Sequence, residues 1–216
     1  MRAALGPGQR DFFSKNHYIE FENLVDNGDD IHAHIDQVLA KRTKKFVETQ
    51  TPKELFMAGR DLFRDDPILQ KASLSRHLGQ IASILFNTTP VRIAYDQSLR
   101  TTTLTGSPFV QPTSLTQVSC FQPILGGAII RLSSDPHSPD FLPKKAGSGV
   151  FFEPNFVLPW SSFFQTPHQS FLLICYTTEK CRYVLNPEDL HTHALKKLGF
   201  GFGDALKNET HPLVFK

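Results

Sequence analysis

The chain has little cysteine, almost no net charge and no long hydrophobic run. Its three cysteines, Cys120, Cys175 and Cys181, are odd in number and lack C-x-x-C spacing, which argues against a disulfide framework and favours reduced, buried thiols. The longest apolar run, Phe171 to Tyr176, is far too short to span a bilayer, and the first residues lack the apolar centre of a signal peptide. We therefore expect a cytoplasmic protein with no membrane contact.

The charges of the chain nearly cancel. Its 23 Lys and Arg residues stand against 21 Asp and Glu residues, a net charge of +2, which is too small for a nucleic-acid footprint spread over the surface. The basic clusters at 41–45, 144–145 and 196–197 are typical of solvated helix faces and helix ends. We therefore expect no nucleic-acid partner.

The first half of the chain carries the pattern of helices. Thr51-Pro-Lys-Glu54 has the form of a capping box with proline at the first helical position. Asp66-Pro67 begins another helical stretch, and Asp29 or Asp30 can cap a longer helix with one apolar face.

From Pro90 onward the apolar residues recur with a period of two, which is typical of strands. The expected strands are 91–98, 114–122, 128–133, 148–153, 171–177 and 182–185. Asn186 and Pro187 then begin an expected C-terminal helix that ends at Gly199.

Composition and order together predict one α+β domain. The 216 residues are 40% apolar and include 19 phenylalanines, enough for a single sizeable core. Helices followed by many short strands favour a jelly roll, which is a double-stranded β-helix with a cupin-like core. The parts expected within residues 1–216 are a mainly helical cover (1–89), the jelly-roll strands (90–185), and a C-terminal helix and tail packed on the core (186–216).

Two segments in the second half carry a family resemblance. Residues 147–160 read Gly-Ser-Gly-Val-Phe-Phe-Glu-Pro-Asn-Phe-Val-Leu-Pro-Trp, and residues 169–177 read Gln-Ser-Phe-Leu-Leu-Ile-Cys-Tyr-Thr. Both resemble the last core strands of the non-haem Fe(II)/2-oxoglutarate-dependent oxygenases, in particular their phytanoyl-CoA dioxygenase-like branch. Residues 8–19 and 91–97 resemble the opening helix of that branch and the segment leading into its first core strand.

The resemblance implies an iron(II) site made of an H-x-D or H-x-E motif and a distal histidine, with an arginine for the 2-oxoglutarate carboxylate. In this chain the distal histidine falls on Leu158 and the arginine on Gln169 or Ser170. The proximal motif should lie within 111–122, which contains no His, Asp or Glu. Hydroxyl, amide and aliphatic side chains do not replace such ligands.

The resemblance and these departures together predict a divergent protein without ordinary dioxygenase activity, whose retained cavity binds a small molecule or a protein partner. Gln117 and Leu158 should face the same interior cavity. The pocket candidates are Thr116, Gln117, Leu158, Gln169 and Ser170.

Two alternatives stay open. A non-haem iron oxygenase with atypical ligands would bind Fe(II) and 2-oxoglutarate through His137, His168 or His211, converging on the barrel mouth. A metal-responsive regulatory protein ranks below it, because the sequence shows no helix-turn-helix with a basic recognition face. The only H-x-D in the chain, His34-Ile-Asp36, lies in a predicted helix, where the two side chains point to different sides.

Overall fold

The computed structural model describes residues 5–133 and 141–216. One antiparallel sheet of six strands, in the order β1-β4-β3-β5-β2-β6, forms its centre. The strands are β1 (Tyr18–Phe21), β2 (Val91–Arg100), β3 (Phe121–Arg131), β4 (Gly149–Phe152), β5 (Ser170–Tyr183) and β6 (Leu213–Phe215).

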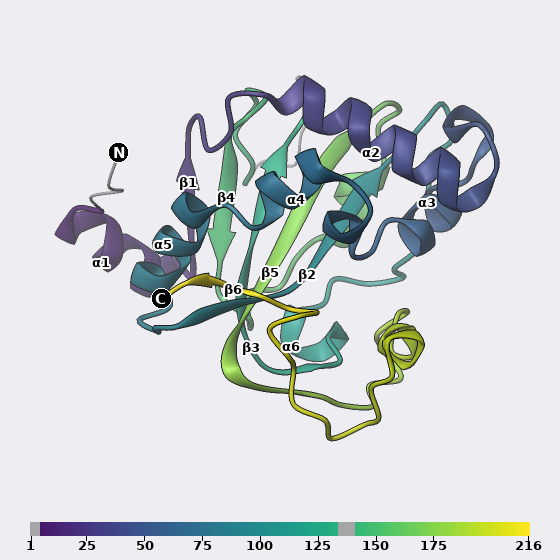
Figure 1. The fold of residues 1–216 in the computed structure, drawn as a ribbon. Helices are drawn as coiled ribbons and strands as arrows, with labels where there is room; N and C mark the ends of the chain where they lie inside the picture. The colour runs from purple at the N-terminus through teal and green to yellow at the C-terminus, as the bar shows by residue number, and fades with distance from the viewer. Residues whose placement is uncertain (1–4, 134–140) are drawn as a thin grey trace.

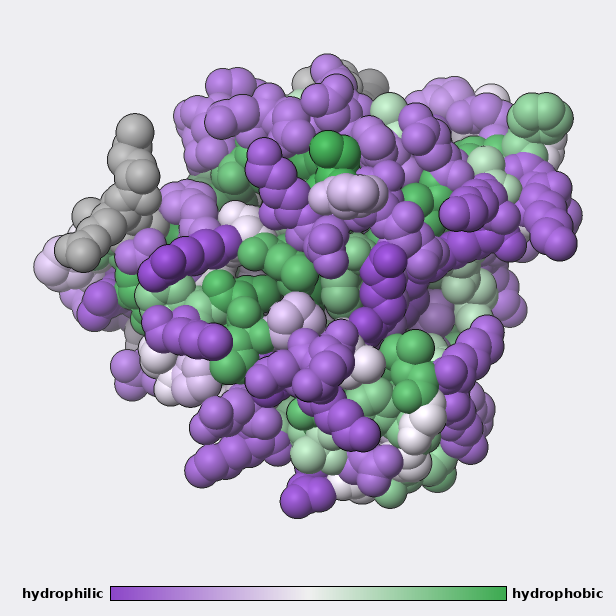
Figure 2. All heavy atoms as spheres, in the orientation of Figure 1, coloured by the Kyte–Doolittle hydropathy of each residue, from purple (hydrophilic) through white to green (hydrophobic). Residues whose placement is uncertain are grey.

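Most of the α-helices cover one face of this sheet. The α-helices are α1 (Pro7–Asn16), α2 (Gly28–Thr43), α3 (Pro52–Ala58), α4 (Pro67–Ser73), α5 (Arg76–Leu85) and α6 (Leu115–Val118). The short 3₁₀ helices are η1 (Val47–Thr49), η2 (Leu62–Arg64), η3 (Trp160–Phe164) and η4 (Ala194–Leu198). In Figure 1, α4 and α5 lie in front of the long strands and α2 runs along their upper end. The same face is mostly hydrophilic in Figure 2, with hydrophobic residues showing in patches. None of the described helices is long and apolar enough to cross a membrane.

The N-terminal helices begin close to the predicted capping residues. Thr51 and Glu54 form the expected reciprocal capping box of α3. Asp66 Oδ1 accepts hydrogen bonds from the first backbone N–H groups of α4. Helix α2 starts earlier than expected, since Asp29 and Asp30 lie in its first turn rather than at its cap, where their charge still favours the helix N-terminus.

The sheet buries a different set of side chains on each face. Along β5, Leu172 and Ile174 belong to the cluster packed against the helices, whereas Phe171 and Leu173 belong to a second cluster on the opposite face, as strand alternation requires. We call this opposite side the interior. Loops close the interior on its far side. Among the described residues these loops form isolated antiparallel bridges, one of which joins Thr113 to Leu158. The architecture is therefore mixed α/β around a curled antiparallel sheet.

The expected strand over 114–122 is wrong in its first part. Leu115–Val118 is helix α6, and β3 begins at Phe121. Ser114 and Gln117 form a capping box there, in which the Ser114 backbone N–H donates to Gln117 Oε1 at 2.9 Å. This local hydrogen bonding outweighs the alternating pattern. The expected strand 171–177 and the first two residues of the expected strand 182–185 are parts of the single strand β5, which ends at Tyr183.

The expected C-terminal α-helix is also wrong. Within 186–216, all of which the structure describes, turns lead into the 3₁₀ helix η4, which ends at Gly199. The Asn186 side chain, expected to cap a helix, donates to the carbonyl oxygen of Gln117 instead. Leu190 and Leu198, which lie within the expected helix, are 39% and 44% exposed. The residues of this segment that pack into the interior cluster are Leu195, Phe200 and Leu206.

Candidate functional site

A buried ion pair occupies the interior of the curled sheet. Arg60, from the loop between α3 and η2, places Nη2 3.5 Å from Asp189 Oδ1 in the C-terminal segment, and the two side chains are 9% and 1% exposed. Arg60 Nε donates to Gln97 Oε1 at 2.9 Å. The guanidinium carbon lies 3.7 Å from the centre of the Tyr95 ring, which is cation–π geometry. The pair thus connects the helical cover, strand β2 and the C-terminal segment.

The carboxylate of Asp189 is fully engaged. Oδ2 accepts from the backbone N–H of Cys120 at 2.9 Å, and Oδ1 accepts from that of His191 at 2.8 Å. Burial pushes the pKa of Asp189 up, but the charge of Arg60 and these hydrogen bonds outweigh it, so the pKa lies below its usual value. Asp189 is therefore an ionised, hydrogen-bonded anchor.

Little empty space is left on the interior side of this pair. The remaining hollow measures about 10 Å³ and is bounded by Arg60, Asp189 and mostly apolar or aromatic neighbours such as Tyr95, Trp160 and Leu173. A single water needs about 10–15 Å³. The interior is therefore a packed core with one ion pair in it.

The three thiols are buried and free, as the sequence predicts. Burial raises the pKa of Cys175 to about 12 and that of Cys181 to about 11, and it raises the pKa of Cys120 further still. Thiols with raised pKa values carry little reactive thiolate. They serve here as core side chains.

The structure does not bring Gln117 and Leu158 to one cavity, so that prediction is wrong. Gln117 is exposed and caps α6. Thr116 is exposed as well and hydrogen-bonds Asn155 Oδ1 at 2.7 Å. Leu158 is buried in the interior cluster, where it forms a bridge with Thr113. Sequence reasoning misplaced the first two residues because it assigned a strand where a capped helix forms.

Gln169 and Ser170 lie buried at the start of β5. Both polar atoms of the Gln169 side chain lack a hydrogen-bond partner among the described residues. Ser170 pairs in register with Arg100 of β2, and its neighbour Phe171 pairs with Arg131 of β3. The strands on either side of β5 thus supply buried arginines at the level where the family resemblance expects one on β5 itself.

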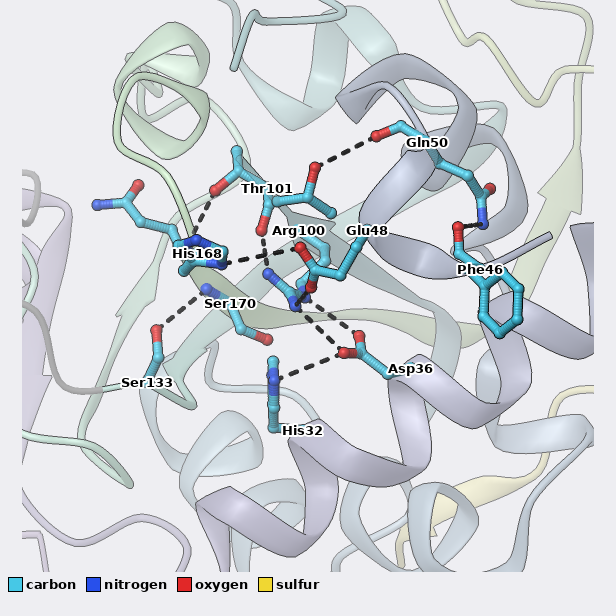
Figure 3. Close-up of polar contacts among 12 residues, drawn as sticks. His32, Asp36, Phe46, Glu48, Gln50, Arg100, Thr101, Ser133, His168 and Ser170 are labelled. Carbon is cyan, nitrogen blue, oxygen red and sulfur yellow. Dashed lines mark hydrogen bonds and ion pairs between the residues drawn. The ribbon is translucent and has the colours of Figure 1, made fainter. Parts of the chain in front are cut away.

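Both arginines are held by neighbouring groups. Arg100 Nε lies 3.1 Å from Asp36 Oδ1, and Nη2 lies 3.2 Å from Glu48 Oε1, a cluster shown in Figure 3. Arg131 Nε donates to the carbonyl oxygen of Pro143 at 2.8 Å, and its guanidinium stacks on Phe171. Arg100 therefore ties α2 and η1 to β2.

The two candidate histidines that the structure describes, His168 and His211, lie in different surroundings. His168 is exposed beside Glu48, with Nδ1 3.9 Å from Oε2 (Figure 3). His211 is buried next to Arg64, and burial together with nearby arginine charges lowers the pKa of His211 to about 3. His137 lies outside the described residues. Across 5–133 and 141–216, no group of three His, Cys, Asp or Glu side chains could hold a metal ion.

The H-x-D pair of α2 diverges as expected. His34 Nδ1 lies 2.8 Å from Asp66 Oδ2, whereas Asp36 turns to Arg100. The two histidines after Asp189 diverge as well, because His191 is buried and His193 is exposed.

A much larger hollow lies outside the interior, between α3 and the C-terminal segment. It measures about 990 Å³, and we call it the α3 groove. One wall includes Lys53 and Met57 of α3, and the other includes Leu190 and Lys197. His191 lies at its base, where Nε2 is 3.2 Å from the Met57 carbonyl oxygen and burial lowers the ring pKa to about 3. Sequence reasoning missed this groove because its walls come from segments more than a hundred residues apart.

Comparison with known proteins identifies the fold. No family model matches the chain, and no curated protein matches it either. Among solved structures, the non-haem α-ketoglutarate-dependent carbocyclase SnoK from nogalamycin biosynthesis is 14% identical with a TM-score of 0.72, covering 97% of this chain and 96% of SnoK. The non-haem α-ketoglutarate-dependent epimerase SnoN of the same biosynthesis is 13% identical with a TM-score of 0.72, covering 96% and 97%.

A third similar structure is CT296 from Chlamydia trachomatis, which is 17% identical with a TM-score of 0.52 and covers 82% of this chain and 99% of CT296. At these identities the likeness concerns the fold alone. The chain has the fold of the non-haem iron, 2-oxoglutarate-dependent oxygenases.

Proposed function

We propose that this protein is a ligand-binding protein built on the double-stranded β-helix of the 2-oxoglutarate-dependent oxygenases, a divergent relative of the phytanoyl-CoA dioxygenase-like branch that lacks oxygenase activity. The observation that carries the proposal is the Arg60–Asp189 pair. The pair lies in the interior of the curled sheet, where the hollow bounded by both side chains measures about 10 Å³.

The donor groups of this interior do not fit iron(II) with 2-oxoglutarate. A facial triad needs two histidines and a carboxylate on one side of the metal. Leu158 and Thr113 face each other across the bridge where the resemblance expects the distal histidine. Asp189, a carboxylate buried in this interior, already binds a guanidinium and two backbone N–H groups.

The α3 groove is the binding site that we propose in place of the interior. Its volume of about 990 Å³ lies at the upper end of the range of about 300–1,000 Å³ typical of ligand pockets. Its walls combine apolar and charged side chains, as such pockets commonly do.

Anaerobic titration with Fe(II) and 2-oxoglutarate tests the absence of oxygenase chemistry. We expect no charge-transfer absorption and no consumption of 2-oxoglutarate after air is admitted, with a 2-oxoglutarate-dependent enzyme of the same fold as the positive control. An absorption band that saturates at one iron per chain would contradict the proposal and favour the oxygenase with atypical ligands.

A further inference from the structure

We propose that the α3 groove binds a small organic anion, with Lys53 and Lys197 holding a phosphate or carboxylate and Met57 and Leu190 covering an apolar or aromatic body. This inference rests on the proposed function and specifies the chemistry of its ligand. The four side chains come from two walls, α3 on one side and the C-terminal segment on the other.

The charges around the groove leave two lysines uncompensated. Three other cations at the groove have acidic partners: Arg42 with Asp65 at 2.7 Å, Lys45 with Glu54 at 3.0 Å, and Arg60 with Asp189 at 3.5 Å. The remaining acid, Asp61, lies 3.4 Å from Arg64. The side chains of Lys53 and Lys197 make no ion pair or hydrogen bond with the residues that the structure describes. Both lysines line the same groove, and an anion bound there would neutralise this uncompensated positive charge.

The apolar side chains of the groove also come from both of its walls. Met57 is 44% exposed and Leu190 is 39% exposed, and both line the groove with Ala58 and Ala194 beside them. Covering half-exposed apolar side chains is favourable, and the flexible thioether of methionine adapts well to aromatic groups. The site therefore suits a ligand with an anionic head and an apolar body better than inorganic phosphate or a neutral apolar molecule.

A small molecule fits these observations better than a nucleic acid. The hollow is of ligand size, and the two free lysines are a local excess in a chain whose net charge is only +2. A polyanion would need a broader basic surface.

Methionine methyl NMR tests the proposal directly, with phenyl phosphate as the probe. The chain has two methionines, so a ¹³C-methyl-methionine sample gives one signal from Met57 in the groove and one from Met1. We expect the Met57 signal, assigned with Met57→Leu, to shift saturably with phenyl phosphate. Inorganic phosphate and phenol should bind at least about tenfold more weakly, because each offers only half of the ligand.

Charge removal completes the test. The double variant Lys53→Ala/Lys197→Ala should bind phenyl phosphate about tenfold more weakly, a difference of about 1.4 kcal/mol. Lys41→Ala/Lys71→Ala is the matched control, since both lysines are exposed outside the groove, and it should bind like the parent protein. A Met57 signal that does not move up to millimolar probe, or equal binding by both double variants, would overturn the inference. Either result leaves the iron titration unaffected, so the two proposals fail separately.

Discussion

Two buried arginines of this protein lie in opposite settings. Arg100 is 4% exposed, but its partners Asp36 and Glu48 lie at the surface, 27% and 54% exposed. Arg60 and its partner Asp189 are both withdrawn from water. When a partly exposed ion pair loses one partner, water can solvate the charge that remains. When a buried ion pair loses one partner, the remaining charge stays buried without compensation, which is costly. The difference indicates that the interior pair is more sensitive to the loss of one partner than the Arg100 cluster, which has two partly exposed partners.

The largest effect should follow from removing the C-terminal segment. A chain truncated after Leu185 loses Asp189 together with the buried side chains of Leu195, Phe200 and Leu206. Each large apolar side chain contributes about 1.5–3 kcal/mol through burial. We expect an insoluble or strongly destabilised product, measured by solubility and thermal unfolding. A soluble monomer that unfolds at the parent temperature would mean that the segment does not support the interior.

A smaller but still large effect is expected from Asp189→Ala. The substitution leaves Arg60 buried without its counter-charge and also removes the acceptor for the Cys120 and His191 backbone N–H groups. Breaking a buried pair in this way costs about 3–5 kcal/mol. Urea unfolding measures the loss, with the nearly isosteric Asp189→Asn as a milder companion. A loss below about 1 kcal/mol would make the interior pair equivalent to a surface pair.

The stability of the protein should also fall at acidic pH because of His211, which is buried. Its folded pKa of about 3 lies below the unfolded value of about 6.5, so the unfolded chain binds more protons between these values. Stability therefore falls as pH drops from 6.5 towards 3, by about 2 kcal/mol at pH 5 from this group. His211→Gln should flatten the plot of unfolding free energy against pH by that amount. Burial raises the pKa of Asp96 to about 7, so Asp96 makes the unfolding free energy change with pH in the opposite direction. This contribution is the same in both proteins and cancels when the two plots are subtracted. Parallel plots for the two proteins would refute a neutral buried His211.

The smallest effect is expected at the other arginine. Glu48→Gln removes a 54% exposed partner while Asp36 still contacts Arg100. Exposed ion pairs are worth about 0.2–1 kcal/mol, so we expect a destabilisation in that range that shrinks in high salt. A loss comparable with that of Asp189→Ala would erase the contrast between the two regions.

The sequence predicts local features well and long-range ones poorly. The capping box of Thr51 and Glu54 depends on residues three apart, and the structure confirms it. Gln117 was misplaced because its own capping box competes with an alternating pattern. Asp189 occupies a segment with helical signals, yet its carboxylate is drawn inward by Arg60, a partner 129 residues away. No local pattern could have revealed that contact, or the α3 groove that forms beside it.

A double-mutant cycle between Arg60 and Asp189 tests the central claim most directly. The cycle measures the unfolding free energies of the parent protein, Arg60→Met, Asp189→Leu and the double variant, and the Arg100–Glu48 pair provides the matched reference. If the interior is a packed core closed by this pair, the coupling energy should be about 2–3 kcal/mol, and the double variant should be more stable than either single variant. A coupling energy below about 0.5 kcal/mol, equal to that of the Arg100–Glu48 pair, would contradict this account, because the interior pair would then behave like a solvent-exposed one.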